Sequence, residues 1–220
     1  MTEEAFYGES LPRIQAARKQ LLELIEKYPE EKRENGGIQA IMYCCSRIKT
    51  PESMIKKLQI HGLPQDCESA LSHMHDTIGI RIICSFFDEV YRVAEWLKEQ
   101  PEIAVLQVKD YIAYPKPNGY RSYHLILSIL EGPGAGMKAE IQLRTLAIDF
   151  WASLEHQIKY KKNVEHAEKV IARLKECADE IAHVDETMQE IRMEMDNIKE
   201  EPSDVEALYE KLKKIDINFM

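Results

Sequence analysis

The chain has 220 residues, 45% of them hydrophobic, and a formal net charge of -9 at pH 7. This length and composition predict one compact domain with helical extensions, and the acidic balance argues against stable binding to duplex nucleic acid. The acidic start resembles no secretory signal, and no apolar run is long enough to span a bilayer. We therefore expect a cytoplasmic protein that contacts no membrane and keeps its five cysteines reduced.

The first part of the chain predicts helices. Apolar residues recur at helical spacing over residues 9–28, and a charged linker over 29–37 ends in Asn-Gly-Gly. A short helix is expected over 38–45. Another begins at Thr50, because threonine is a good N-cap and the proline that follows fits the first helical position. One more helix is expected to end near residue 75.

The middle of the chain predicts a sheet. Residues 78–87 are rich in β-branched and aromatic side chains, which is typical of a buried strand. An amphipathic helix opens at Asp88. Three further strands are predicted at 104–112, 123–130 and 138–144.

The last part of the chain is almost wholly helical. One helix is expected from Thr145 to about Tyr160, and a short one from Asp204. Between them, apolar residues alternate steps of three and four, like the a/d seam of a coiled coil. The seam comprises Leu174, Cys177, Ile181, Val184, Met188, Ile191, Met195 and Ile198. Such a seam needs a partner, which could be the N-terminal helix, the domain body or another subunit.

A basic stretch over residues 47–57 forms a candidate phosphate site. Arg47 and Lys49 point the same way in an extended segment, and Ser53 and Lys57 share one helix face. The free N–H groups at the start of that helix also favour anions. A triphosphate would suit this set, although a solvated basic surface is the simpler alternative.

Two strands offer carboxylates and a cation for chemistry. Arg81 faces away from its isoleucine neighbours and could stack on a base or form a structural ion pair. Strand alternation sends Glu140, Gln142 and Arg144 to one face, as in an ordinary half-solvated strand. A Glu so placed can bind Mg²⁺ or take a proton from a hydroxyl, with Asp76 as the second carboxylate of the metal site.

An aromatic residue stands beside two cations in the segment before the third predicted strand. Tyr120 follows Asn118-Gly119, a turn signal that can expose its ring. The ring could stack a base while Lys116 and Arg121 hold phosphates, although most tyrosines serve in packing.

Taken together, these segments closely resemble the synthetase domain of the RelA/SpoT family, and the size resembles its small alarmone synthetases. The matching pieces are RIKTPESMIKK, DTIGIRI, KDYIAYPKPNGYRSYH, EIQLRT and DFWASLEHQIKYK. The resemblance implies an α+β, nucleotidyltransferase-like fold: a mixed β-sheet flanked by helices, with an N-terminal helix and a long C-terminal helical extension. We expect an N-terminal helical segment (1–37), a catalytic core (38–162) and an extension for oligomerisation (163–220).

The activity that the resemblance implies is transfer of pyrophosphate from ATP to the 3′-hydroxyl of GTP or GDP, with Mg²⁺ as cofactor and no hydrolase domain. Adenine would lie between Arg47 and Arg81, and the ATP phosphates would be held by Lys49, Ser53 and Lys57. Asp76 and Glu140 would bind the metal, and Glu140 would also activate the hydroxyl. Guanine would stack on Tyr120, helped by Asn118, His124 and Gln142. The acceptor phosphates would meet Lys116, Arg121 and Arg144.

Two alternatives keep part of this reading. Some relatives pyrophosphorylate the 3′ end of tRNA and act as toxins, but the acidic total argues against an RNA surface. A catalytically silent nucleotide-binding scaffold is the other alternative, and retention of Asp76 and Glu140 argues against it. We also expect a homo-oligomer, with a tetramer favoured by the resemblance.

Overall fold

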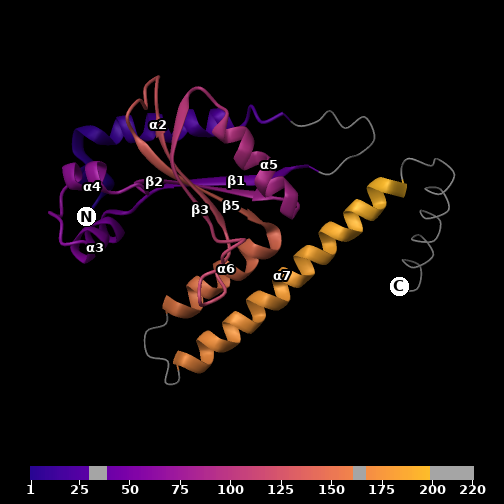
Figure 1. Cartoon of the computed structure of the whole chain (residues 1–220). Coiled ribbons are helices and arrows are strands. Elements are labelled where there is room, and N and C mark those ends of the chain that lie inside the picture. The colour runs from indigo at the N-terminus through magenta and orange to yellow at the C-terminus, as the bar shows by residue number, and fades with distance from the viewer. Residues whose placement is uncertain (30–38, 161–166, 199–220) are drawn as a thin grey trace, which may run out of the picture.

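A five-stranded mixed β-sheet forms the centre of the molecule, which was studied as a computed structural model that describes residues 1–29, 39–160 and 167–198 (Figure 1). The strands are β1 (Ile41–Ile48), β2 (Ile78–Cys84), β3 (Ile103–Asp110), β4 (Tyr123–Ile129) and β5 (Lys138–Thr145). They lie in the order β1-β2-β5-β4-β3. Only β2 and β5 pair in parallel among these strands; the other three pairings are antiparallel.

Helices cover the sheet and extend from it, which confirms the predicted α+β class. They are α1 (Glu3–Tyr7), α2 (Leu11–Ile25), α3 (Pro51–Ile60), α4 (Cys67–His73), α5 (Phe87–Lys98), α6 (Leu146–Tyr160) and α7 (Ala167–Ile198), with a 3₁₀ turn at Gly8–Ser10. The apolar faces of α2 and α5 share one buried core with the inward side chains of the sheet, among them Ile80, Leu125 and Ile141. The opposite sheet face is left to carry polar groups.

The segment predicted as a short helix over 38–45 is a strand instead. β1 begins at Ile41 and pairs antiparallel with β2 along its whole length. Pairing with a strand far along the chain outweighs the weak local helical pattern, since β-branched and aromatic residues fit an edge strand well. The linker predicted over 29–37 lies, apart from Pro29, outside the described residues.

Helix α3 begins as the sequence predicts. The side chain of Thr50 accepts a hydrogen bond from the backbone N–H of Ser53, and Pro51 occupies the first helical position. This cap fixes the turn between β1 and α3, so that Lys49 and Lys57 approach the same corner of the sheet. Within the described residues, no helix has both the length and the apolar character to cross a membrane.

Helix α7 is as long as predicted, but its apolar seam divides between two environments. Helix α7 runs beside α6 (Figure 1). Leu174 and Ile181 pack against Trp151 of α6, whereas Val184, Met188 and Ile191 are exposed to solvent. Farther along the helix, Gln189 accepts from the backbone N–H of Asp88, and Arg192 donates to Asp88 and Glu89. The side chain of Ile198 and the helix predicted from Asp204 lie outside the described part of the chain.

Candidate active site

Polar side chains cross the open face of the sheet in register. Gln142 on β5 lies opposite Arg81 on β2 and opposite His124 on β4. Its Nε2 donates to Glu140 Oε2 at 2.9 Å, and its Oε1 accepts from Arg144 Nη2 at 3.0 Å. The predicted alternation of Glu140, Gln142 and Arg144 on one face is therefore confirmed as a hydrogen-bonded row.

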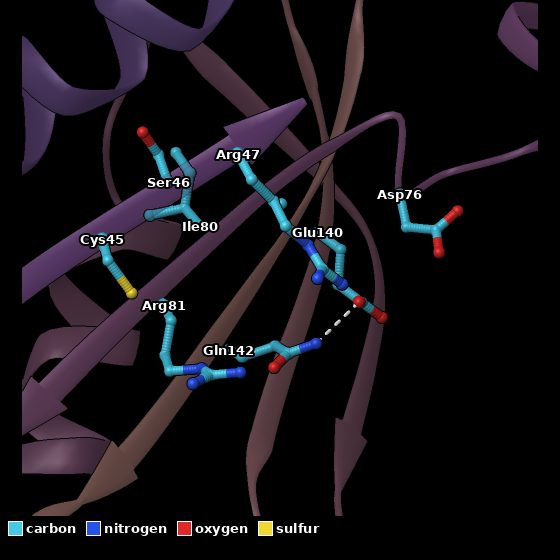
Figure 2. A pocket seen from close by; sticks show the side chains of 9 residues that line it. Cys45, Ser46, Arg47, Asp76, Ile80, Arg81, Glu140 and Gln142 are labelled. Atoms are coloured by element: carbon cyan, nitrogen blue, oxygen red, sulfur yellow. Dashed lines mark hydrogen bonds between the residues drawn. The ribbon is translucent and has the colours of Figure 1, made fainter. Parts of the chain in front are cut away.

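A pocket of about 270 Å³ opens on this row. It is lined by Cys45, Ser46, Arg47, Asp76, Gly79, Ile80, Arg81, Glu140 and Gln142. Figure 2 shows Glu140 between Gln142 and Asp76, with Arg47 reaching over from β1. Arg47 passes across Gly79, where a Cβ would lie 3.7 Å from Arg47 Cγ. The pocket thus gathers two guanidinium groups and two carboxylates, as the sequence predicted.

Arg81 forms the structural ion pair that was considered from the sequence, and it also lines the pocket. Its guanidinium lines the pocket, and its Nη1 also lies 3.1 Å from Asp149 Oδ1 in a salt bridge. Asp149 pairs with Arg144 as well, at 2.9 Å. The shared carboxylate holds Arg81 at the edge of the pocket, where one face of its planar group can meet a base.

Asp76 forms salt bridges with two lysines. Its Oδ2 lies 2.9 Å from Lys49 Nζ and 2.8 Å from Lys57 Nζ. Burial alone would raise the pKa of Asp76, but the hydrogen bonds from Lys57 and Lys49 outweigh it and hold the pKa below its ordinary value. Ser53 sits at the start of α3 and accepts a hydrogen bond from the Thr50 hydroxyl at 2.9 Å. The carboxylate is therefore ionised beside the predicted phosphate cations.

Glu140 is also held as a carboxylate. Burial raises its pKa, but a hydrogen bond and the charge of His124, with a further hydrogen bond from Gln142, lower the pKa to about 2. Because ionised Glu140 can only accept, His124 Nδ1 is the donor in the 3.3 Å contact between them. The other ring nitrogen, Nε2, lies within hydrogen-bond distance of the Tyr120 hydroxyl, 3.0 Å away.

A hydrogen-bonded chain thus connects an aromatic platform to Glu140. Arg144 Nη2 donates to the Tyr120 oxygen at 2.9 Å, and Tyr120 and His124 continue the chain to Glu140. Tyr111 packs edge-on against both rings, and Lys116 Nζ lies 4.5 Å from the Tyr111 ring centroid and 5.1 Å from that of Tyr120. Tyr111 was not among the predicted site residues, although its place at the end of a predicted strand, shortly before Lys116, was an available signal.

Hydrogen bonds to α6 and α7 hold the loop that carries Tyr120 in place. Asn118 Oδ1 accepts from the Tyr120 backbone N–H at 3.4 Å, and its Nδ2 donates to Glu155 at 2.9 Å. Arg121 donates to the Gly119 and Ala178 carbonyl oxygens and pairs with a carboxylate of α7. The structure brings Tyr120 and His124 to Glu140, but it places Arg121 against α7.

The predicted metal ligands fit an oxygen-binding cation. Asp76 and Glu140 line the same pocket, and Asp76 Oδ1 is buried without a hydrogen-bond partner among the described residues. Across residues 1–29, 39–160 and 167–198, no three His, Cys, Asp or Glu side chains group so as to hold a metal by themselves. Mg²⁺ commonly takes one or two carboxylates and completes its shell with phosphate oxygens and water, so two carboxylates suit it.

The sequence of this chain is similar to those of known proteins. Residues 46–165 match the profile described as the region found in RelA / SpoT proteins. The GTP pyrophosphokinase YwaC of Bacillus subtilis is 44% identical over 163 residues, which is 73% of this chain and 78% of the relative. The GTP pyrophosphokinase YjbM of the same organism is 37% identical over 158 residues, or 70% of this chain and 74% of the relative.

Solved structures agree with these sequence matches. Small alarmone synthetase 2 from Bacillus subtilis superposes with a TM-score of 0.73 at 38% identity, over 86% of this chain and 99% of that one. Small alarmone synthetase 1 from the same organism, bound to its product pppGpp, superposes with a TM-score of 0.73 at 32% identity, over 84% and 95% of the two chains.

Proposed function

This chain belongs to the RelA/SpoT family, and we propose that it works as a GTP pyrophosphokinase of the small alarmone synthetase type. The observation that carries the proposal is the position of Glu140. It lies in one pocket with Asp76, Arg47 and Arg81, and it is hydrogen-bonded through His124 to the Tyr120 platform. A nucleotide on each side would therefore meet at this carboxylate. Among the residues that the structure describes, no contact favours tRNA as the acceptor or a catalytically silent scaffold.

The cation-rich side suits the donor nucleotide, ATP. Arg47 and Arg81 line the pocket from neighbouring strands and would enclose the adenine. Lys49 and Lys57 converge at Asp76, where their ammonium groups would balance the charge of the β- and γ-phosphates. Ser53, in the first turn of α3, would add a hydroxyl to the same phosphates.

Asp76 and Glu140 would hold Mg²⁺, which supplies charge neutralisation on the transferring phosphate when it is bound. The orphaned Oδ1 of Asp76 supports this role because a buried carboxylate oxygen without a partner is costly.

The aromatic side suits the acceptor, GTP or GDP. Guanine would stack on Tyr120, with Asn118 holding the loop and with His124 and Gln142 as polar neighbours. The acceptor 3′-oxygen attacks the β-phosphorus of ATP, and the bond from that phosphorus to the bridging oxygen of AMP breaks. AMP leaves with the electron pair, and the hydroxyl proton passes to Glu140.

The low pKa of Glu140 bears on its role. A carboxylate with a pKa of about 2 is a weak base, so it orients the hydroxyl and accepts the proton late in the step. A loose phosphoryl-type transition state needs little prior deprotonation of the attacking oxygen. Positioning of the two nucleotides then supplies most of the rate enhancement.

The same proposal covers assembly and organisation. We infer a homo-oligomer because Val184, Met188 and Ile191 form an apolar side of α7 that the described residues leave exposed. The resemblance to small alarmone synthetases favours a tetramer. The division into segments 1–37, 38–162 and 163–220 and a cytoplasmic location belong to this proposal as well.

One experiment tests the reaction. The purified chain is incubated with Mg²⁺ and ATP together with GTP, GDP or deacylated tRNA, and products are separated by anion-exchange chromatography. We expect AMP and a guanine nucleotide that carries an added 3′-pyrophosphate, with tRNA unchanged. Pyrophosphate transfer to tRNA alone, or no AMP with any acceptor, would contradict the proposal.

A further inference from the structure

Asp149 connects one helix to three neighbouring strands of the sheet. It stands in the first turn of α6, which begins directly after β5, and its side chain reaches back to the strands. The carboxylate pairs with Arg144 of β5 and with Arg81 of β2, and its Oδ2 accepts from the Tyr43 hydroxyl of β1 at 3.2 Å. The first turn of a helix also favours a negative charge. The carboxylate therefore has a defined place between strands.

A single oxygen of this carboxylate serves both arginines. Asp149 Oδ1 lies 2.9 Å from Nη1 of Arg144 and 3.1 Å from Nη1 of Arg81. The Arg144 side chain is only 5% exposed, so its charge needs a close counter-ion. The Arg81 side chain is 34% exposed and lines the pocket proposed for the donor base. One oxygen thus joins an enclosed guanidinium to one that faces a ligand.

Arg144 carries the connection on to the acceptor side. Its Nη2 donates to the Tyr120 oxygen at 2.9 Å, and its guanidinium carbon lies 5.4 Å from the centroid of the same ring. The Tyr120 ring is the platform proposed for guanine. Arg144 and Asp149 therefore connect the acceptor platform to the arginine of the donor pocket.

The contacts in this connection leave the ligand-binding faces free. A guanidinium donates through its edge and stacks through its face, so Arg81 can keep Asp149 while a base lies on its plane. The phenol ring behaves in the same way, because the bond from Arg144 meets the Tyr120 oxygen and not the ring face. Binding of both nucleotides therefore leaves every contact between the two base sites in place.

We propose that Asp149 is a positioning residue that couples the two base sites, so that either nucleotide binds more tightly when the other is present. A base on Arg81 restricts this partly exposed side chain and, through Asp149, the orientation of Arg144 and the Tyr120 hydroxyl. The second nucleotide then has fewer groups left to order, and the effect is reciprocal. This inference rests on the proposed function for the identity of the two ligands.

Titration calorimetry on the full chain with Mg²⁺ measures the coupling. The probe is an ATP analogue with a methylene group between the α- and β-phosphates, which binds but cannot react. The ratio of its dissociation constants without and with saturating GDP is the coupling factor. We expect Asp149→Asn to lower this factor about fivefold relative to the wild type. Direct contacts between the nucleotides, and a shared metal ion, are present in both proteins, so the difference measures Asp149.

The matched control is Tyr43→Phe, which removes the third contact to the same carboxylate and touches neither base site. Its coupling factor should match that of the wild type within about twofold. Arg144→Lys is a second test, because it keeps the enclosed charge but one ammonium cannot hold Asp149 and Tyr120 in the same arrangement. It should lower the coupling factor as Asp149→Asn does.

A general loosening of the fold would weaken the binding of each nucleotide alone and leave the ratio unchanged. The inference is overturned if the wild-type factor is near one, or if a folded Asp149→Asn keeps the wild-type value. If Asp149→Asn does not fold, as judged by its melting temperature, Arg144→Lys decides by the same criterion. Product formed in the assay above together with an unchanged factor would defeat this inference alone. Absence of product with every acceptor would defeat the proposed reaction, while the calorimetry would still report the coupling.

Discussion

Arg121 and Asp179, 58 residues apart, form a 3.0 Å ion pair that fastens the Tyr120 loop to helix α7. The same guanidinium donates to the carbonyl oxygens of Gly119 and Ala178, so one side chain connects both backbones. The position of the predicted guanine platform therefore depends on how α7 lies against the body. A helix expected to mediate assembly is thus in contact with the acceptor site.

Replacing Asp179 with Asn should loosen this connection. The charge-assisted bond from Arg121 becomes a weaker neutral one, and we expect the KM for GTP to rise about threefold while the KM for ATP stays unchanged. Steady-state kinetics with each nucleotide varied in turn would measure the effect. Glu180→Gln, the next residue along and exposed, is the matched control. A parallel rise in both KM values would show that α7 does not act through the acceptor loop.

Gly119 should tolerate no side chain. Its φ is +86°, and an added Cβ would lie 2.6 Å from Ala178 Cβ and 3.3 Å from Lys175 Cα. We expect Gly119→Ala to lower the free energy of unfolding by about 2–4 kcal/mol, from backbone strain plus the clash with α7. The control is Gly62→Ala, where φ is +67° but nothing lies within 4 Å, so only the strain of about 1–2 kcal/mol applies.

A second substitution separates the two contributions in Gly119→Ala. Adding Ala178→Gly removes the atom at 2.6 Å and should recover the part of the stability that the clash cost. Urea unfolding of the wild type and the three variants would give the free energies of unfolding. Equal destabilisation by Gly119→Ala and Gly62→Ala would mean that α7 does not pack against the loop in solution.

Glu140→Gln should abolish transfer with little change in fold. The amide cannot accept a proton and is a poorer metal ligand, so we expect the rate to fall by at least about a hundredfold. Product formation from ATP and GTP measures the rate, and the melting temperature at neutral pH checks the fold. Product made at the wild-type rate would remove Glu140 from the mechanism.

Glu140 should also contribute to acid sensitivity. Its pKa falls from 4.5 in the unfolded reference to about 2 in the fold, so the folded state disfavours proton binding. A lowered pKa gives stability that is fully present above pH 4.5 and is lost as the pH drops toward 2. Over that window the wild type should lose stability faster than Glu140→Gln, as followed by thermal unfolding in a pH series. Identical slopes for the two proteins would contradict the pKa assignment.

Tyr120 offers a test that separates ring from hydroxyl. Tyr120→Ala removes the stacking surface, and we expect the KM for GTP to rise about tenfold with the KM for ATP unchanged. Tyr120→Phe keeps the ring and loses only the hydroxyl contacts to His124 and Arg144, so its effect should be smaller. Initial rates at varied GTP would rank the variants. A Phe variant as impaired as the Ala variant would argue for a role of the hydroxyl in place of stacking.

The sequence predicts which side chains share a face of the sheet wherever this depends only on the alternation of residues along one strand. Glu140, Gln142 and Arg144 follow from a period of two, and the start of α3 follows from Thr50 and its proline. These features depend on neighbours in the sequence, so a single segment contains the needed information. The prediction of a helix over residues 38–45 was wrong because pairing with β2, a distant segment, decides that this segment is the strand β1.

Other parts of the site depend on distant segments. The engagement of Arg121 follows from the packing of α7, which no local pattern records. A further pocket, lined by Lys109 of β3 and by His61 and His73 at the ends of α3 and α4, also depends on the assembled sheet. Histidines in such positions look like ordinary surface residues in the sequence.

The central place of β5 has a consequence for biogenesis. This strand is the last of the five in the sequence, yet it lies between β2 and β4. A nascent chain can pair β1 with β2 and β3 with β4 while two inner edges stay open, and such edges invite association with other chains. Insertion of β5 closes both edges and delivers Glu140 in the same event. Recovery of activity on refolding should therefore follow the slow, long-range closure of the sheet.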